Sequence, residues 1–476
     1  MQRVPLVTAV LTAAFCPAAP GQSGGADGDL QKRLERQMRE RDKAWRTDTP
    51  AGATLADRLL LDWGGSASFS LSGIDDAGGT PHTLRQSDGR AWLRADLDGS
   101  QRVYGRLKFR YDDWNTGDDF DGEGDDLREP IGERWWYELK LDHADLKVGK
   151  QFIDWGNGLA LSNHLIGATL EADLGPAALT LVIGDTPAND FVDFDASRPH
   201  FDTNTKRRFV GALLETSGGE PTAFLHVLRQ IDRNDRDSGL FVDGLGQLYS
   251  VDFDYDSTYF GVGGHGSLGG TMSWRAELDF ETGRALSSPI SAAGSPQTQT
   301  REDLCGWAFD TGVSWAGNDA AKTRVDLGLA VASGDDDRLD SADTFGGNLS
   351  GTDDTSFNSF GFIDTGVALA PDPGNLVILH LGGESSPLWS KGPEWARLRA
   401  VVDGYFFAKL DSDAPINVAT TADRVVGGEI DVGFDWSLLS DLSLNFRYGL
   451  FIPGKAMPPG EDGARQLLYG GVTYAF

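Results

Sequence analysis

Basic side chains occur at every second position in part of this sequence, and that spacing is its strongest hint of chemistry. Arg106, Lys108 and Arg110, for example, alternate with apolar residues. Alternating positions of an extended segment share one face, so these charges would stand in a row. Fixed positive charge that faces water inside a low-dielectric wall attracts and guides anions. We therefore predict an anion path composed of Arg90, Arg94, Arg102, Arg106, Lys108, Arg110, Arg134, Lys140, Lys147, Arg397, Arg399 and Arg447.

The same faces also carry acids, and these allow a second interpretation. The acids expected to share the faces are Asp96, Glu138, Asp142, Glu277, Asp279, Asp326, Asp403, Glu429, Asp431 and Asp435. Ladders of ion pairs would use both sets of residues simply to compensate buried charge. The sequence leaves a selective anion path and a structural ion-pair network open.

Two acidic clusters suggest a possible site for calcium. One contains Asp118, Asp119, Asp121 and Glu123, and the other contains Asp335, Asp336 and Asp337. Calcium binds clustered oxygen ligands, but the first cluster does not fit the register of the Asp-x-Asp-x-Asp-Gly loop. Solvated acidic loops are the alternative, and no cofactor other than Ca²⁺ is suggested.

Several classes of protein are excluded by composition and motifs. The net charge of −30 argues against a nucleic-acid partner, because phosphate binding needs an excess of Lys and Arg. Two cysteines, Cys16 and Cys305, cannot form a disulfide scaffold. The seven histidines form no His-Glu-x-x-His motif, and no Gly-x-Ser-x-Gly elbow occurs after Leu59, where the alternating segments begin. We expect no enzymatic activity.

The elements that must position these side chains are strands. After Leu59, apolar and polar residues alternate in about eighteen segments, one beginning near Leu248 and another near Trp395. Short turns such as 98–100 alternate with long loops such as 333–375. Short connections at one end and long ones at the other are typical of a transmembrane β-barrel. The predicted fold is all-β, a transmembrane antiparallel barrel of about 18 strands with a short N-terminal helix.

The chain divides into three predicted segments. Residues 1–21 resemble a signal peptide, with Arg3, an apolar run and a zone of small residues. Residues 22–58 hold an amphipathic helix and a linker, and residues 59–476 form the barrel. The final strand ends in Phe476, an ending that resembles the assembly signal of outer-membrane barrels. We predict export to the outer membrane of a diderm bacterium, where the barrel-assembly machinery is an expected partner.

Two regions resemble the alginate export family. Val148-Gly149-Lys150-Gln151 followed by Trp155-Gly156-Asn157-Gly158 is similar to that family's Gly-Arg/Lys-Gln and aromatic-Gly hairpin, and 428–431, 442–444 and 448–454 resemble its closing strands. The resemblance implies an 18-stranded outer-membrane channel, whose founding type passes an anionic polyuronate through a lumen lined by Arg and Lys. Leu159 stands where an arginine is expected after the aromatic-Gly turn.

The predicted function is a channel for passive passage of hydrophilic, anionic or polyuronate-like solutes. A general diffusion porin with no polysaccharide role is one alternative. Another is a plugged barrel that acts as a surface scaffold or receptor through its acidic loops. The expected partners are the lipid outer membrane and a hydrophilic or polysaccharide solute, while the oligomeric state stays open. The loop at 333–375 is a candidate constriction, provided that it folds inward.

Overall fold

The computed structural model describes most of the predicted barrel. The described residues are 60–75, 81–97, 99–115, 125–187, 206–233, 238–242, 248–252, 254–288, 291, 295–338 and 348–476. The predicted signal peptide, N-terminal helix and first acidic cluster (Asp118, Asp119, Asp121 and Glu123) lie outside the described residues. No helix within the described ranges is long and apolar enough to cross a membrane.

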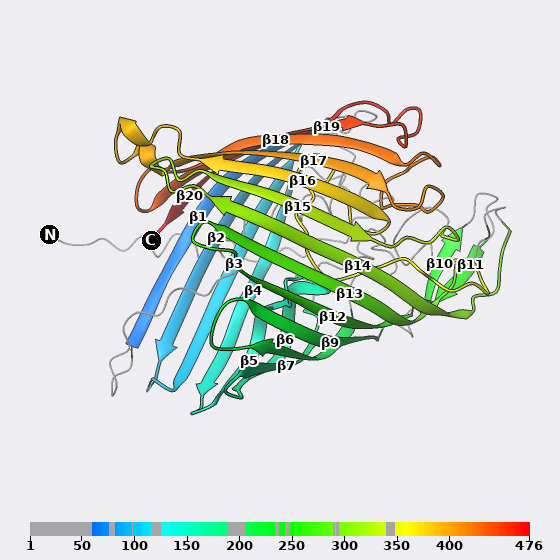
Figure 1. Ribbon diagram of the computed structural model, residues 1–476, viewed down its shortest axis with the longest axis horizontal. Helices are drawn as coiled ribbons and strands as arrows, with labels where there is room; N and C mark the ends of the chain where they lie inside the picture. Colours follow the sequence, from blue (N-terminus) through cyan, green and yellow to red (C-terminus); the bar gives the residue numbers. More distant parts are fainter. Residues whose placement is uncertain are drawn as a thin grey trace.

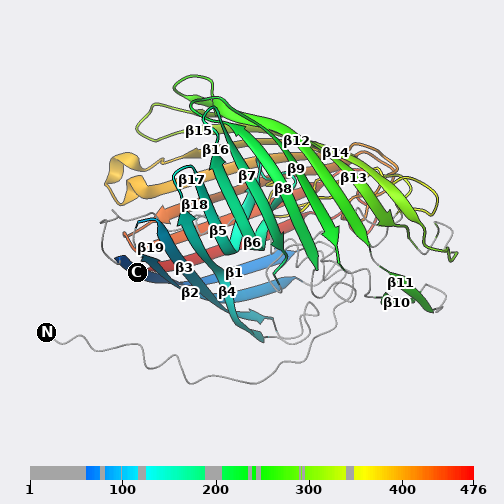
Figure 2. The ribbon, with the colours of Figure 1, turned by 90° about the horizontal axis from the view of Figure 1, so that it is seen from below.

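Eighteen antiparallel strands form one closed ring (Figures 1 and 2), which confirms the predicted fold class. The strands of the ring are β1 (Leu60–Asp75), β2 (His82–Asp96), β3 (Gln101–Trp114), β4 (Asp125–Lys140), β5 (Ala144–Trp155), β6 (Leu161–Asp173), β7 (Ala177–Asp185), β8 (Arg207–Thr216), β9 (Thr222–Asp232), β12 (Tyr255–Ser267), β13 (Met272–Leu286), β14 (Arg301–Ala316), β15 (Arg324–Ala332), β16 (Leu376–Ser385), β17 (Leu398–Lys409), β18 (Val425–Ser437), β19 (Leu442–Pro453) and β20 (Arg465–Ala475). Pairing of β1 with both β2 and β20 closes the ring. A closed ring leaves no unpaired sheet edge in lipid.

Two strand boundaries differ from the prediction. The segment at Leu248–Asp252 is β11, which pairs with β10 (Ser238–Val242) in a separate hairpin beyond the ring. The corresponding ring strand, β12, begins at Tyr255. Trp395 lies in the 3-10 helix η3 (Trp395–Arg397), which follows η2 (Trp389–Lys391). Alternation continues through both segments, so the pattern alone could not show where the ring strands begin.

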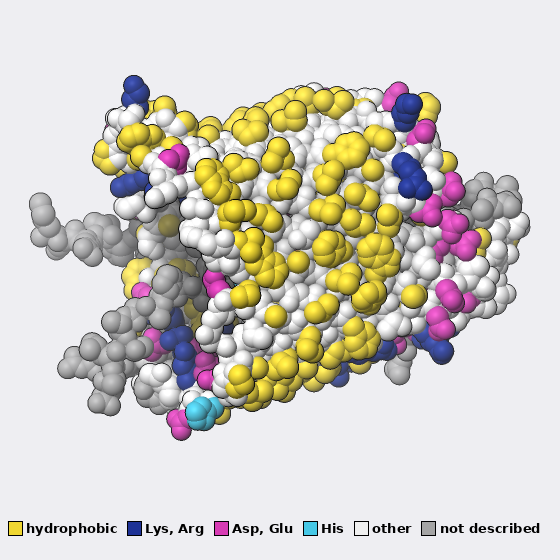
Figure 3. Space-filling model, in the orientation of Figure 1, with side chains coloured by type: hydrophobic (Ala, Val, Ile, Leu, Met, Phe, Trp, Pro, Cys, Tyr) yellow, Lys and Arg dark blue, Asp and Glu magenta, His cyan; other side chains and the backbone are white. Residues whose placement is uncertain are grey.

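The outer face of the ring is apolar because of strict alternation along the strands. On β12, Phe260 and Val262 are 50% and 56% exposed, whereas Tyr259, which precedes Phe260 and faces the interior, is fully buried. Phe280 on β13, the cross-strand partner of Phe260, also lies on the outer face. Figure 3 shows such side chains as a broad hydrophobic belt, with charged residues gathered toward the two ends. This distribution suits a barrel surrounded by lipid.

The two ends of the barrel carry different connections. One end bears short turns such as 268–271 and 317–323, and we term it the short-turn end. The opposite end, termed the long-loop end, bears the 333–375 connection between β15 and β16 and the β10–β11 hairpin. The hairpin and the two 3-10 helices lie at opposite ends in Figure 1. In outer-membrane barrels the short turns face the periplasm and the long loops face outward.

Part of the long connection folds into the barrel, which the constriction hypothesis requires. We call residues 348–375 the lumen loop. At one wall, Phe360 donates its backbone N–H to Ala160 (3.1 Å), and Phe362 donates to Gly158 (3.0 Å). At another wall, backbone N–H groups of the loop donate to the Glu429 carboxylate on β18. These two attachments, on β18 and at the start of β6, are eight strands apart in the 18-strand ring. The lumen loop therefore crosses the interior.

Apolar packing fixes the lumen loop at both attachments. Phe357 and Phe360 belong to one buried cluster that includes Trp155 on β5. Leu369 belongs to a second cluster that includes Phe407 on β17. Full burial of each such side chain contributes about 1.5–3 kcal/mol. The loop is a packed part of the interior wall of the pore.

Candidate functional site

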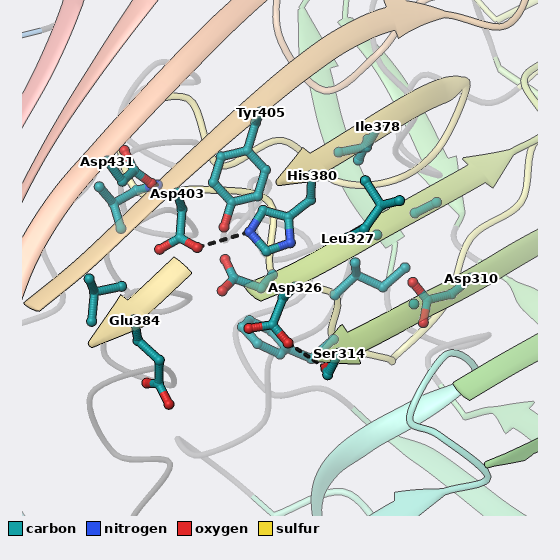
Figure 4. Close-up of a pocket in the computed structure, with 18 of the residues that line it drawn as sticks. Asp310, Ser314, Asp326, Leu327, Ile378, His380, Glu384, Asp403, Tyr405 and Asp431 are labelled. Atoms are coloured by element: carbon teal, nitrogen blue, oxygen red, sulfur yellow. Dashed lines mark hydrogen bonds and ion pairs between the residues drawn. The ribbon is translucent and has the colours of Figure 1, made fainter. Parts of the chain in front are cut away.

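A cavity of about 1140 Å³ lies inside the barrel between the lumen loop and the wall. Side chains from β13 to β20 line most of it, and Ile363, Asp364 and Val367 of the lumen loop line another side. Figure 4 shows the wall formed by β14 to β18, where a row of carboxylates points toward the cavity. This cavity is our candidate functional site, because it is the water-accessible space that the inward-facing residues shape.

The part of the cavity nearer the short-turn end is lined by both signs of charge. Each arginine there has a carboxylate partner that lines the same cavity. The pairs are Arg275–Asp310 (3.2 Å), Arg324–Asp326 (2.7 Å), Arg399–Glu384 (3.3 Å) and Arg447–Asp435 (2.7 Å). The four arginine side chains are between 29% and 56% exposed, so water reaches them. Their formal charges cancel pair by pair, and solvation weakens each attraction.

The remainder of the cavity is acidic. Four further carboxylates line it, namely Asp154, Asp364, Asp403 and Asp431. Among the described residues lining the cavity, the one basic side chain paired with any of them is His380, whose Nε2 lies 2.9 Å from Oδ1 of Asp403. The imidazole also stacks on Tyr405 with ring centres 4.6 Å apart. This pair is labelled in Figure 4. The fixed charge in this part of the pore is negative.

Contacts within the protein orient these acids. The lumen loop donates the backbone N–H of Val367 to Oδ2 of Asp431 (3.1 Å). Ser162 donates its hydroxyl to Oδ1 of Asp154 (2.5 Å). Such contacts hold carboxylates in place without cancelling their charge, because the donors are neutral.

The β2 and β3 arginines of the predicted anion path lie outside this cavity, and they belong to ion pairs. Arg90 and Arg106 share Glu133, with nitrogen–oxygen distances of 3.1 and 2.7 Å, and all three side chains are at least 92% buried. Others pair similarly, namely Arg94 with Asp96, Arg102 with Asp96 and Glu138, and Arg110 with Asp88. These residues face the interior but do not line the described cavity. Their geometry favours the structural-network interpretation.

The other predicted members are scattered. Arg134 lies over the Phe152 ring at 5.4 Å, and Lys147 lies over Trp136 at 4.9 Å. Lys140 is exposed 4.0 Å from Asp145 near a short turn, Lys108 is partly exposed on β3, and Arg397 lies in η3. Of the twelve predicted residues, Arg399 and Arg447 line the cavity.

Sequence reasoning missed several important side chains. Glu133 lies opposite a register shift between β3 and β4, where Arg106 pairs with Arg134 but Leu107 pairs with Gly132. This bulge buries both Glu133 and Arg134, although strict alternation would place them on opposite faces. Arg275, Arg324 and His380 were also missed. Arg275 and Arg324 each lie two positions before an acid that the alternation assigned to the interior, Glu277 and Asp326. His380 lies on the strand next to a third such acid, Asp403. The expectation that each interior acid has a basic partner was therefore the available signal.

The second predicted calcium cluster, Asp335 to Asp337, lies within the described residues. The carboxylate oxygens of Asp335, Asp336 and Asp337 approach within 4.8 Å of one another. Asp335 already accepts the backbone N–H groups of Asp337 (2.8 Å) and Thr355 (2.6 Å). Burial, together with the nearby Asp354 carboxylate, raises the pKa of Asp335 above its ordinary value. These contacts account for a loop turn, and Ca²⁺ binding here stays a prediction.

Comparison with known proteins agrees with this architecture. The sequence profile of the alginate export family matches residues 187–469. No curated protein sequence matches the chain. The barrel resembles OccK11 (OpdR) of Pseudomonas aeruginosa, with a TM-score of 0.53, 13% identity and coverage of 89% of this chain and 98% of that one. It also resembles OccAB1 of Acinetobacter baumannii, with a TM-score of 0.54, 10% identity and coverage of 87% and 96%.

A third similar structure was solved with a ligand. It is OccK2 (OpdF) of Pseudomonas aeruginosa in complex with glucuronate, with a TM-score of 0.51, 14% identity and coverage of 87% of this chain and 98% of that one. At identities of 10–14%, the similarity to these structures shows the fold alone. The profile match, the closed ring and the apolar belt together confirm an outer-membrane barrel that is a channel for solutes rather than an enzyme.

Proposed function

This chain belongs to the alginate export family, and on that premise we propose that its channel passes small hydrophilic solutes with a preference for those that carry positive charge. The observation behind the proposal is the imbalance of charge in the cavity. Four arginines near the short-turn end are matched by four acids, whereas Asp154, Asp364 and Asp403 face one histidine. A net negative wall around a narrow aqueous path enriches cations and excludes anions.

Reversal potential measured in a planar bilayer tests this proposal. Under a KCl gradient, the folded full-length mature chain should give a potential of the sign expected for K⁺ permeation. The Asp403→Asn variant should shift that potential toward zero, because it removes a charge that lines the cavity. Asp441→Asn is the matched control, since that acid lies in a short turn outside the cavity lining. A potential of the opposite sign in the wild type would overturn the proposal.

A second candidate function is passage of a uronate or another small anion. It is supported by the water-exposed Arg399 and Arg447 in the cavity and by the glucuronate complex of a protein with a similar fold. If this candidate is correct, glucuronate should reduce the KCl current, and Arg447→Gln should weaken that block. Current that is neither selective nor blocked would identify a general diffusion porin. Folded protein that carries no current would favour the scaffold alternative.

A further inference from the structure

A buried cluster lies in the wall beside the cavity, without lining it. His226 on β9 and Glu277 and Asp279 on β13 have side chains with no exposed surface. Nε2 of His226 lies 3.0 Å from Oε1 of Glu277 and 3.2 Å from Oδ1 of Asp279. Two aromatic rings enclose the imidazole, Phe224 at 6.1 Å and Trp155 at 6.2 Å between ring centres. Three polar side chains therefore converge in an apolar environment.

The strand between them leaves room for this convergence. Gly261 on β12 pairs with His226 on one side and with Asp279 on the other. A β-carbon at Gly261 would lie 2.0 Å from Nε2 of His226 and 2.1 Å from Oδ1 of Asp279. Any other residue at this position would displace both polar groups. The glycine thus allows side chains from two strands that are not neighbours to meet across a third.

The cluster is incompletely satisfied within the described part of the chain. Apart from the 3.2 Å contact between its Oδ1 and Nε2 of His226, Asp279 has no hydrogen-bond donor there, and Nδ1 of His226 has no hydrogen-bond partner. Glu277 differs, because its Oε2 accepts the backbone N–H of Asn157 at 2.9 Å. A fully buried carboxylate without a hydrogen-bond donor is rare in native proteins and often indicates a bound ion or water.

We propose that His226, Glu277 and Asp279 bind a divalent transition-metal ion, for which Zn²⁺ is the natural probe. Zinc takes imidazole nitrogen and carboxylate oxygen ligands at about 2.0–2.2 Å in a tetrahedral arrangement, so two ligands of one ion lie about 3.3–3.6 Å apart. The distances from Nε2 of His226 to the two carboxylates, 3.0 and 3.2 Å, are a few tenths of an ångström shorter, so the side chains need to separate only slightly to admit the ion. A neutral imidazole with two carboxylates carries a charge of −2, which a divalent ion cancels and a single added proton does not.

The bound ion would have a structural role in the wall. It would connect β9 to β13 across β12, directly beneath the turn after β5. That turn contains Gly156 and Asn157, which line the cavity, and the Asn157 N–H already orients Glu277. Hydrogen bonds from outside the ligand set commonly orient metal ligands in this way. The ion would therefore fix one side of the pore without contacting the solute.

Metal analysis of refolded protein tests the site. The full chain is refolded into detergent with Zn²⁺, separated from free metal, and analysed by mass spectrometry for zinc per chain. We expect one zinc in the wild type and none in Asp279→Asn or His226→Gln. Glu281→Gln is the matched control, because Glu281 lies on the same strand and face, two residues beyond Asp279, and is equally buried. It should retain the zinc.

Three results would overturn the proposal. Folded wild type without zinc would show that the cluster is an ion pair, completed by a proton or a water molecule. Zinc retained in both Asp279→Asn and His226→Gln would place the metal elsewhere. If neither variant folds, refolding of the wild type with Co²⁺ decides, because cobalt bound to imidazole and carboxylates has visible absorption bands. Their absence from folded protein would then count against the site.

Discussion

Ala368 of the lumen loop donates its backbone N–H to Oε1 of Glu429 at 2.6 Å, and this contact joins the loop to the far wall. Val367 and Leu369 donate to the same carboxylate at 2.6 and 2.8 Å. Glu429 is 1% exposed, so water does not compete for these bonds. Hydrogen bonds to a charged group contribute about 1.5–3 kcal/mol each. Three of them at one carboxylate make it the main polar attachment of the loop.

Weakening that attachment should make the lumen loop more mobile and so change the conductance of the pore. Glu429→Gln replaces one acceptor oxygen by an NH₂ group, which faces a backbone donor and cannot bond to it. We expect single-channel recordings to show larger current fluctuations and a higher mean conductance than the wild type. Asp441→Asn, in a short turn, is the control and should behave as the wild type. Unchanged noise and conductance would mean that apolar packing alone holds the loop.

Removing the crossing segment should widen the pore more strongly. Replacing residues 359–370 with a short Gly-Ser linker eliminates both wall attachments, so conductance should rise well above that of Glu429→Gln. Deletion of the β10–β11 hairpin is the control, because that hairpin lies beyond the ring at the long-loop end. If the linker variant folds and its conductance equals that of the wild type, the lumen loop is not the constriction.

Breaking the buried ion pairs on β2 to β4 should destabilise the barrel. Glu133→Gln leaves the guanidinium groups of Arg90 and Arg106 buried without their shared carboxylate. Removing one partner of a buried pair costs about 3–5 kcal/mol of unfolding free energy. Asp145→Asn breaks an exposed pair with Lys140 at 4.0 Å and should cost no more than about 1 kcal/mol. Denaturant unfolding in detergent or lipid measures both.

The same residues also test the original anion-path prediction. If Arg102, Arg106 and Arg110 guide solutes, their combined substitution by glutamine should change the reversal potential of the channel. If they are structural, the substitution should lower stability and leave ion selectivity nearly unchanged in the fraction that folds. The ion pairs with Asp96, Glu133 and Asp88 favour the second outcome.

A charged residue on the lipid-facing belt should lower the unfolding free energy, and the loss should grow with the depth of the residue in the bilayer. Val262 lies near the middle of β12 and is 56% exposed on the outer face. Val262→Lys should reduce the unfolding free energy by about 2–4 kcal/mol, whereas Leu268→Lys, in the adjoining turn, should cost about 0–1 kcal/mol. Equal effects at the two positions would show that Val262 does not face the membrane core.

The stability of the lumen-loop region should depend on pH through Asp335. Its pKa is raised by burial and by the carboxylate of Asp354, so the folded chain binds a proton there more tightly than the unfolded chain does. Its stabilising contribution is present at acidic pH and is lost as pH rises through the raised pKa. Relative to the wild type, Asp335→Asn should therefore gain stability over that window. Unfolding curves that stay parallel at every pH would contradict this expectation.

The strand count and the inward faces could be predicted because alternation is a local property. Arg106, Asp279 and Asp403 face the interior as expected. Alternation does not report whether water reaches an inward side chain, so it could not show that Arg106 is only 3% exposed. A β-bulge interrupts the alternation, so the pattern places Glu133 on the wrong face.

Relationships between distant segments were beyond the reach of local patterns. Nothing near Ala368 in the sequence indicates that its backbone will meet Glu429, which is 61 residues away. The contact depends on how the ring closes and on which side of it the lumen loop lands. The convergence of His226 with Asp279 likewise depends on the register of an intervening strand. Sites of this kind can be identified only when the complete fold is known.

The lumen loop spans the barrel from the start of β6 to β18, and this has a mechanical consequence. Because the lumen loop connects two opposite walls, the width of the pore depends on how circular the cross-section of the barrel is. Lateral pressure that flattens the barrel along this line must compress the loop, whereas pressure from the sides must stretch it or release Glu429. The bilayer in which the protein sits would thereby adjust the width of its pore.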